Sequence, residues 1–124
     1  MKLEDFLASA AAAGRTAGVE RSLREGADVN CVNEFGRTPL QVMMMGNTTV
    51  ARLLLSYGAR PNVADQSTRT TPLHDAAREG FLDTVKVLVE FSADPRALDF
   101  HNRRPVDLAK ESGHCDVVAF LEAL

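Results

Sequence analysis

The chain has 124 residues, a length that suits one domain with a substantial buried core. Apolar residues make up 45% of the sequence and charged residues 25%, a balance that excludes disordered and fibrous proteins. The 14 lysines and arginines against 17 acidic residues give a formal net charge of −3, which argues against a nucleic-acid-binding surface. We therefore expect a single globular domain over residues 1–124 that binds no nucleic acid.

The N-terminus and the cysteines bear on the compartment. Glu4 and Asp5 stand where a signal peptide would carry positive charge, and no stretch approaches the roughly 18 apolar residues that cross a bilayer. Cys31 and Cys115 lie far apart, with no Cys-x-x-Cys pair to indicate a disulfide framework or a zinc clip. The sequence favours a soluble, unsecreted protein in a reducing compartment, without membrane contact.

A period of 33 residues runs through the chain. It is carried by a tripeptide around a proline, and Leu7 precedes Leu40 by the same 33 residues. The tripeptides are Thr38-Pro39-Leu40, Thr71-Pro72-Leu73 and Arg104-Pro105-Val106. We expect four repeats, approximately residues 1–32, 33–64, 65–98 and 99–124.

Each repeat reads as two short helices. Proline suits the first helical turn and threonine before it can cap free N–H groups, so first helices are predicted to begin at residues 39, 72 and 105. Second helices are predicted between glycines, at 14–26 and 46–58. Small side chains at Ala10, Ala11, Ala76 and Ala77 let neighbouring first helices approach closely, and the apolar stripe Val85, Val87, Leu88 and Val89 closes the layer behind.

Three positions depart from the repeat. Leu40 to Gly46 spans one residue fewer than Leu73 to Gly80, so the first helix of the second repeat, Gln41 to Met45, is predicted to be truncated. The connection from Asp65 to Thr71 is one residue longer than its counterpart from Asn33 to Thr38, which restores the period. Ser92 replaces the glycine after a second helix, so we expect it in the left-handed conformation. This conformation should cost the protein about 1 kcal/mol of stability relative to glycine.

Residues 71–76, Thr-Pro-Leu-His-Asp-Ala, match in full the run Thr-Pro-Leu-His-x-Ala, and the chain thereby resembles the ankyrin repeat. The resemblance implies an all-α ankyrin-repeat solenoid of four helix-turn-helix units with short hairpin-like connections. It also implies that His74 is structural and ties one hairpin to the next.

Residues 41–46, Gln-Val-Met-Met-Met-Gly, residues 74–83, His-Asp-Ala-Ala-Arg-Glu-Gly-Phe-Leu-Asp, and residues 105–109, Pro-Val-Asp-Leu-Ala, identify a narrower family. They resemble the ankyrin-repeat inhibitors of cyclin-D-dependent kinases, most closely the four-repeat members. The resemblance implies a protein that is no enzyme and that binds the kinase catalytic subunit beside its ATP cleft, distorts the kinase and opposes cyclin activation. Cell-cycle arrest before DNA replication would follow, with the inhibitor in the cytoplasm and nucleus and monomeric when free.

Three charged residues of the third repeat are candidate kinase contacts. Asp75 falls at an inner-face position where the packing of the repeat asks for no carboxylate, so we expect it to meet a basic side chain of the partner. Arg78 and Glu79 lie one turn further along and either contact the kinase, pair with Asp75, or are solvated.

Five further candidates come from the connections and the truncated helix. Asp65 opens the longer hairpin and is either a turn former or a kinase contact. A truncated helix cannot bury three consecutive methionines on one face, so either Met43 or Met44 is expected to reach the partner. Phe35 at a hairpin tip and Phe81 after Gly80 serve either local packing or contact.

Enzyme chemistry finds no support in the sequence. His114 and Cys115 pair a base with a nucleophile, but neighbours on a helix point apart. No Gly-x-x-x-x-Gly-Lys loop or His-Glu-x-x-His motif occurs, so neither a cofactor nor a metal is implied. The alternative function is a general ankyrin adaptor for another protein, such as a transcription factor or a membrane-skeleton protein.

Overall fold

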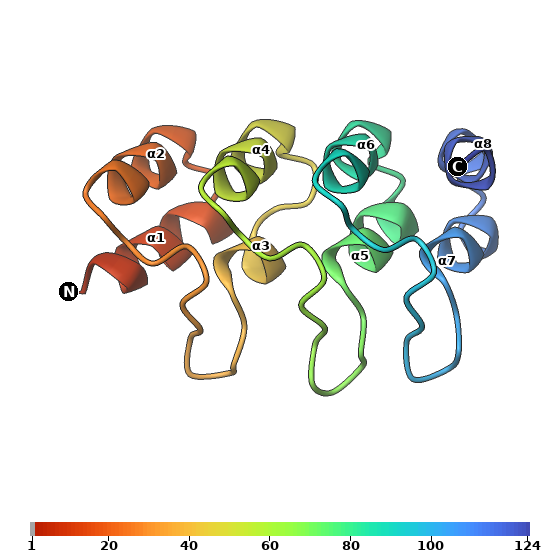
Figure 1. The fold of residues 1–124 in the computed structure, drawn as a ribbon, viewed down its shortest axis with the longest axis horizontal. Helices are drawn as coiled ribbons and strands as arrows, with labels where there is room; N and C mark the ends of the chain where they lie inside the picture. The colour runs from red at the N-terminus through yellow and green to blue at the C-terminus, as the bar shows by residue number, and fades with distance from the viewer. Residues whose placement is uncertain (1) are drawn as a thin grey trace. The chain divides into compact units, whose positions relative to one another are not determined.

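The computed structural model describes residues 2–124, and the chain divides into two compact units, the first ending at Arg60 and the second beginning at Pro61. The first unit holds α1 (Leu3–Ala12), α2 (Thr16–Arg24), α3 (Pro39–Val42) and α4 (Thr48–Ser56). The second unit holds α5 (Pro72–Glu79), α6 (Leu82–Glu90), α7 (Pro105–Glu111) and α8 (Cys115–Glu122). Residues 2–124 contain no strand, so the expected all-α fold of helix pairs is confirmed (Figure 1). That the 124 residues form a single domain stays a prediction.

In the first unit, first helix packs against first helix and second helix against second helix. Helix α1 packs against α3, and α2 packs against α4. Fully buried residues fill the space between them: Leu7, Ala10, Ala11, Val19, Val50, Ala51 and Leu54. The alanines on α1 have no exposed surface, and α1 packs against α3. This is consistent with the close approach of first helices that the small side chains predicted.

The second unit repeats this arrangement. Helix α5 packs against α7, and α6 packs against α8. Its fully buried apolar residues are Leu73, Ala76, Ala77, Val85, Leu88, Ala109 and Val117. The predicted stripe on α6 is largely confirmed, since Val85, Val87 and Leu88 are buried, whereas Val89 is half-buried.

The first helices of the second, third and fourth repeats begin at the three prolines, as predicted. The hydroxyls of Thr38 and Thr71 accept from the N–H groups of Gln41 and His74, each at 3.4 Å. In the fourth repeat Arg104 replaces the threonine, and the side chain three residues on still bonds back to the cap residue: the Asp107 carboxylate accepts from the Arg104 N–H at 2.8 Å. The Arg104 guanidinium and N–H donate to this carboxylate and hold the pKa of Asp107 below its ordinary value.

Helix α3 is even shorter than the sequence predicted. It ends at Val42, and Met43 is already extended, with φ −64° and ψ 160°. The predicted extension of this helix to Met45 is therefore wrong: the chain from Leu40 to Gly46 lacks the residue that would complete a second turn. Helix α5 has eight residues and ends on Gly80 in the left-handed conformation, with φ 80°.

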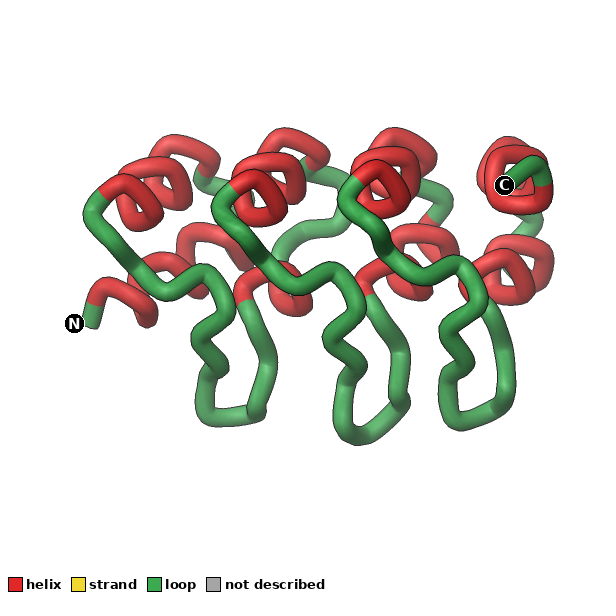
Figure 2. Tube along the Cα trace, in the orientation of Figure 1, coloured by secondary structure: helices red, strands yellow, loops and turns green. Residues whose placement is uncertain are grey.

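Long loops follow the second helices (Figure 2), and each contains a short closed segment that we call a finger. The first finger is residues 33–37, the second 65–70 and the third 99–103. In each, the N–H of the first residue donates to the carbonyl of the last, at 2.9, 2.8 and 3.1 Å respectively. The second finger thus has one more residue than the others, as the spacing from Asp65 to Thr71 predicted.

Asparagines tie each loop to the following one within its unit. The Asn30 amide donates to the Gly58 carbonyl at 3.0 Å and accepts from the Arg60 N–H at 2.9 Å. The Asn62 amide makes the corresponding bonds to the Ser92 carbonyl and the Asp94 N–H, at 3.1 and 2.7 Å. These bonds fix the loops from which the fingers extend.

Candidate functional site

The three charged candidates of the third repeat lie together on α5. The Arg78 guanidinium donates to the Asp75 carboxylate at 2.9 Å, and its Nε lies 3.8 Å from a Glu79 carboxylate oxygen. Of the alternatives for Arg78, pairing with Asp75 is therefore the one that the structure shows. We call Asp75, Arg78 and Glu79 the α5 charge cluster.

The Asp75 carboxylate is incompletely compensated within the chain. Its side chain is 27% exposed, and this burial raises its pKa above the ordinary value, although the Arg78 guanidinium opposes the rise. The carboxylate of Asp65 acts in the same direction as burial, because a second negative charge disfavours ionisation. A basic side chain from a partner would offset both effects by stabilising the ionised carboxylate, and its charge is complementary to this position.

His74 lies beside Asp75 in sequence but belongs to the fold. Its ring is fully buried, with Nδ1 accepting from the Thr71 N–H at 3.0 Å. The other nitrogen, Nε2, then carries the proton and donates to the Arg103 carbonyl of the third finger at 2.8 Å. This histidine joins α5 to the following hairpin, so the structural role predicted for it is confirmed.

Asp65 organises the second finger. Its carboxylate accepts from the Ser67 N–H at 2.8 Å and from the Ser67 hydroxyl at 2.6 Å, and its backbone carbonyl accepts from the Arg69 N–H at 2.7 Å. The turn-forming alternative for Asp65 is therefore present in the structure. A kinase contact by the same carboxylate stays a prediction.

The three consecutive methionines divide between core and surface. Met43 and Met45 are 4% and 9% exposed, whereas Met44 is 56% exposed. The structure thus resolves the choice that the sequence left open, because a buried Met43 offers a partner no surface. The expectation that Met43 reaches the kinase is therefore wrong, and a kinase contact by Met44 stays a prediction.

The two phenylalanine candidates differ in setting. Phe35 is 69% exposed in the first finger, where its N–H donates to the Asn33 side chain at 2.8 Å. Phe81 is 40% exposed and precedes α6, with its N–H donating to the Ala76 carbonyl at 3.0 Å. Met44 and Phe35 belong to the first unit, and the α5 charge cluster, Asp65 and Phe81 to the second.

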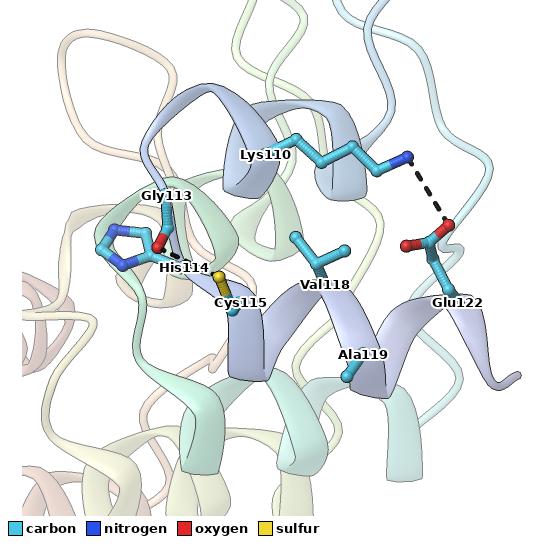
Figure 3. A pocket seen from close by; sticks show the side chains of 7 residues that line it. All are labelled: Lys110, Gly113, His114, Cys115, Val118, Ala119 and Glu122. Carbon is cyan, nitrogen blue, oxygen red and sulfur yellow. Dashed lines mark hydrogen bonds and ion pairs between the residues drawn. The ribbon is translucent and has the colours of Figure 1, made fainter.

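The pair His114 and Cys115 lines a hollow of about 340 Å³ at the start of α8 (Figure 3). His114 Nε2 donates to the Arg78 carbonyl at 3.0 Å, and the Cys115 thiol lies 3.8 Å from the Gly113 carbonyl. The imidazole thus supports the end of α5 rather than activating the thiol. Lys110 and Glu122 pair across the far side of the hollow at 3.5 Å.

Two kinds of feature are absent from residues 2–124. They contain no cluster of three or more His, Cys, Asp or Glu side chains that could hold a metal ion. None of the described helices is long and apolar enough to cross a membrane.

Sequence reasoning missed two arrangements. The Arg104–Asp107 cap had a signal in the Arg-Pro-Val-Asp run, since an aspartate three residues after a cap position can accept from the N–H of the cap residue. The second arrangement is the contact between the Arg69 guanidinium and the Phe100 ring, whose centroid lies 5.3 Å away. The only sequence signal for this contact was the extra residue of the second finger.

The chain matches the ankyrin-repeat family, described with three copies, over residues 7–99 and 50–122. With the paired helices and fingers described above, this match defines an ankyrin-repeat protein. Rat cyclin-dependent kinase 4 inhibitor B is 56% identical over 117 residues, which are 94% of this chain and 90% of the relative.

Two human proteins are similar to the same extent. Human cyclin-dependent kinase inhibitor 2A is 55% identical over 96% of this chain and 76% of the relative, and human cyclin-dependent kinase 4 inhibitor B is 55% identical over 95% and 86%. The chain belongs to the ankyrin-repeat family of cyclin-dependent kinase inhibitors.

Proposed function

We propose that this chain binds the catalytic subunit of a cyclin-D-dependent kinase and inhibits it without doing chemistry of its own. The relatives that share 55% or more of their aligned residues with it are named as inhibitors of cyclin-dependent kinases. The observation that carries the proposal is the α5 charge cluster, where the partly buried Asp75 carboxylate pairs with Arg78, a cation that is itself 45% exposed.

The site would act by complementarity. A basic kinase side chain that reaches Asp75 would gain a partner in a setting with little water, where charge-assisted hydrogen bonds are strong. Exposed apolar side chains, among them Met44, Phe35 and Phe81, would supply the apolar area that anchors such an interface. Binding beside the ATP cleft would distort the kinase and oppose cyclin activation, and so halt the cell cycle before DNA replication. We propose that the protein does this in the cytoplasm and nucleus, as a monomer until it meets the kinase.

Replacing Asp75 by Asn tests the proposal. Asp75→Asn keeps the shape of the side chain and removes its charge, so we expect kinase binding to weaken about thirtyfold or more. The free energy of unfolding should change by less than about 0.5 kcal/mol, because the variant loses a partly exposed ion pair and is relieved of a desolvated charge. Kinase titration and equilibrium unfolding would be measured on one preparation.

Asp83→Asn is the matched control, since Asp83 is an exposed aspartate in the first turn of α6 and lies outside the candidate site. We expect its affinity to equal that of the unmodified protein. Unchanged binding in Asp75→Asn would show that the carboxylate makes no kinase contact.

A second experiment compares capture of cyclin-D-dependent kinases with capture of kinases driven by later cyclins. Capture of neither would reject the proposal in favour of a general adaptor.

A further inference from the structure

The second finger breaks a conformational rule that the other two fingers obey. In each finger the residue before the last has a positive φ: Gly36 at 75°, Arg69 at 59° and Asn102 at 58°. Glycine and asparagine adopt this left-handed conformation readily, whereas arginine does so at a cost. The backbone of the second finger would therefore favour another residue at position 69, and the arginine side chain needs a separate explanation.

The Arg69 side chain contacts the third finger. Its guanidinium carbon lies 5.3 Å from the centroid of the Phe100 ring, within the range of a cation–π interaction. Next to this contact, the Phe100 N–H donates to the Thr68 carbonyl at 3.0 Å. Side chain and backbone thus both join the extra length of the second finger to the third finger, and we call this pair of contacts the finger clamp.

The clamp acts on a segment that bears on the α5 charge cluster. Asp65 opens the second finger, and its carbonyl and carboxylate accept from Arg69 and Ser67 within that finger. The finger ends at Thr70 and leads directly into Thr71, whose hydroxyl caps the helix that carries Asp75. Burial is the main cause of the raised pKa of Asp75, and the nearby Asp65 charge adds a small contribution in the same direction. A change in the conformation of the second finger would therefore change what a partner meets at this end of α5.

We propose that Arg69 and Phe100 are positioning residues for kinase binding, which hold the second finger in the one conformation that presents Asp65 beside the α5 charge cluster. This inference rests on the proposed function. Neither residue needs to touch the kinase, because a finger that samples several conformations lowers the apparent affinity in proportion to the competent fraction.

The principal variant is Arg69→Asn. Asparagine occupies the same place in the third finger and suits the left-handed backbone, so the variant removes the cation without straining the chain. We expect unfolding stability to be unchanged or slightly raised, while kinase affinity falls about five- to tenfold, as for a competent fraction of roughly 10 to 20%. A residue that served only the stability of the fold would not give a stable variant with weaker binding.

Phe100→Leu tests the other half of the clamp, since it keeps an apolar side chain and removes the ring. We expect a similar loss of kinase affinity. The double variant should bind the kinase as well as either single variant, because each single change already removes the contact between the two side chains. Arg69→Lys and Phe100→Tyr keep cation and ring and should restore most of the affinity. Lys86→Ala is the matched control: it breaks the cation–π contact of Lys86 with Phe120, 5.8 Å from the ring centroid, and should leave kinase affinity unchanged.

Backbone amide relaxation of Ser67 to Thr70 in the free protein gives a readout independent of the kinase. We expect Arg69→Asn and Phe100→Leu to lower the order of these amides and Lys86→Ala to leave it unchanged. Unaltered amides in both variants, or mobile amides with full affinity, would overturn the proposal. So would a loss in Arg69→Asn alone, which would mean that the guanidinium contacts the kinase directly.

The same series separates this inference from the proposed function. If the unmodified protein binds no kinase, the proposed function fails and the clamp has no role in kinase binding. If the unmodified protein binds and Asp75→Asn does not, while the clamp variants bind fully, the proposed function stands and only the positioning role is lost.

Discussion

The second and third repeats begin their first helices in the same way and end them differently. Both α3 and α5 start at a proline after a capping threonine, and in both a side chain three residues on returns the cap, Gln41 to the Thr38 N–H and His74 to the Thr71 N–H. Helix α3 then stops after four residues, whereas α5 continues for eight. Local chemistry therefore sets where these helices begin, and the chain length before the following glycine sets where they end.

The different endings give the two repeats different surfaces. The missing turn of α3 leaves Met43 extended and turns Met44 outward, so the second repeat offers an exposed apolar side chain. The last turn of α5 carries Arg78 and Glu79, for which the second repeat has no helical counterpart, so the third repeat offers charge. One residue removed from a repeat thus changes the kind of partner group that it suits.

The methionines provide the largest expected effect. Met43→Ser should lower the free energy of unfolding by about 3 kcal/mol, because it leaves a cavity and buries a hydroxyl among apolar groups. Met44→Ser should change it by less than about 0.5 kcal/mol, since that side chain is 56% exposed, and should weaken kinase binding instead. Denaturant unfolding and kinase titration of both variants check this contrast. Equal losses of stability would show that the second repeat buries Met44 as well.

The left-handed ending of α5 provides the next effect. Gly80→Ala should destabilise the protein by about 2 to 3 kcal/mol, because φ is 80° there and an added Cβ would lie 2.5 Å from Nδ1 of the His114 ring. Gly14→Ala is the matched control at the end of α1, where φ is 72° and the nearest atom is the flexible Met44 sulfur at 3.1 Å.

Gly14→Ala should lower the free energy of unfolding by about 1 to 2 kcal/mol, which is the part of the effect that the positive φ alone causes. Thermal or denaturant unfolding of the two variants gives the difference. If Gly80→Ala cost no more than Gly14→Ala, the His114 ring would be free to move away, and its bond to the Arg78 carbonyl would not support the end of α5.

The repeat period explains how much of this could be predicted from sequence. Prolines 39, 72 and 105 gave the helix starts, and the count from Asp65 to Thr71 gave the longer second finger, because both depend on residues adjacent in the chain. The end of α3 was placed three residues too late, because the spacing showed that one residue is missing before Gly46 but not that the helix ends at Val42 or which methionine is buried.

The candidate site was predicted in part for the same reason. Asp75 and Arg78 are one turn apart, so their pairing was among the alternatives that the sequence allowed. Arg69 and Phe100 are 31 positions apart in the printed sequence and meet only once two fingers lie side by side, which no local pattern encodes. Long-range contacts between loops are the part that needed the structure.

The smallest effect compares the ends of the second helices. Helix α4 is followed by Gly58 with φ 94°, and α6 by Ser92 with φ 73°, so a serine holds in the third repeat the conformation that glycine holds in the second. Ser92→Gly should raise the free energy of unfolding by about 0.5 to 1 kcal/mol, because glycine adopts positive φ without steric strain.

Gly58→Ser is the reciprocal variant and should lower stability by a similar amount. A Cβ at position 58 would meet no atom within 4 Å, so only the backbone preference changes. The Asn62 amide bonds to the Ser92 carbonyl, which survives the substitution, and neither variant should alter kinase affinity. Denaturant midpoints of the two single variants and of the double variant test this, since independent, opposite backbone effects should cancel in the double variant. A lower midpoint in Ser92→Gly would mean that the serine side chain itself stabilises this turn by more than its left-handed backbone costs.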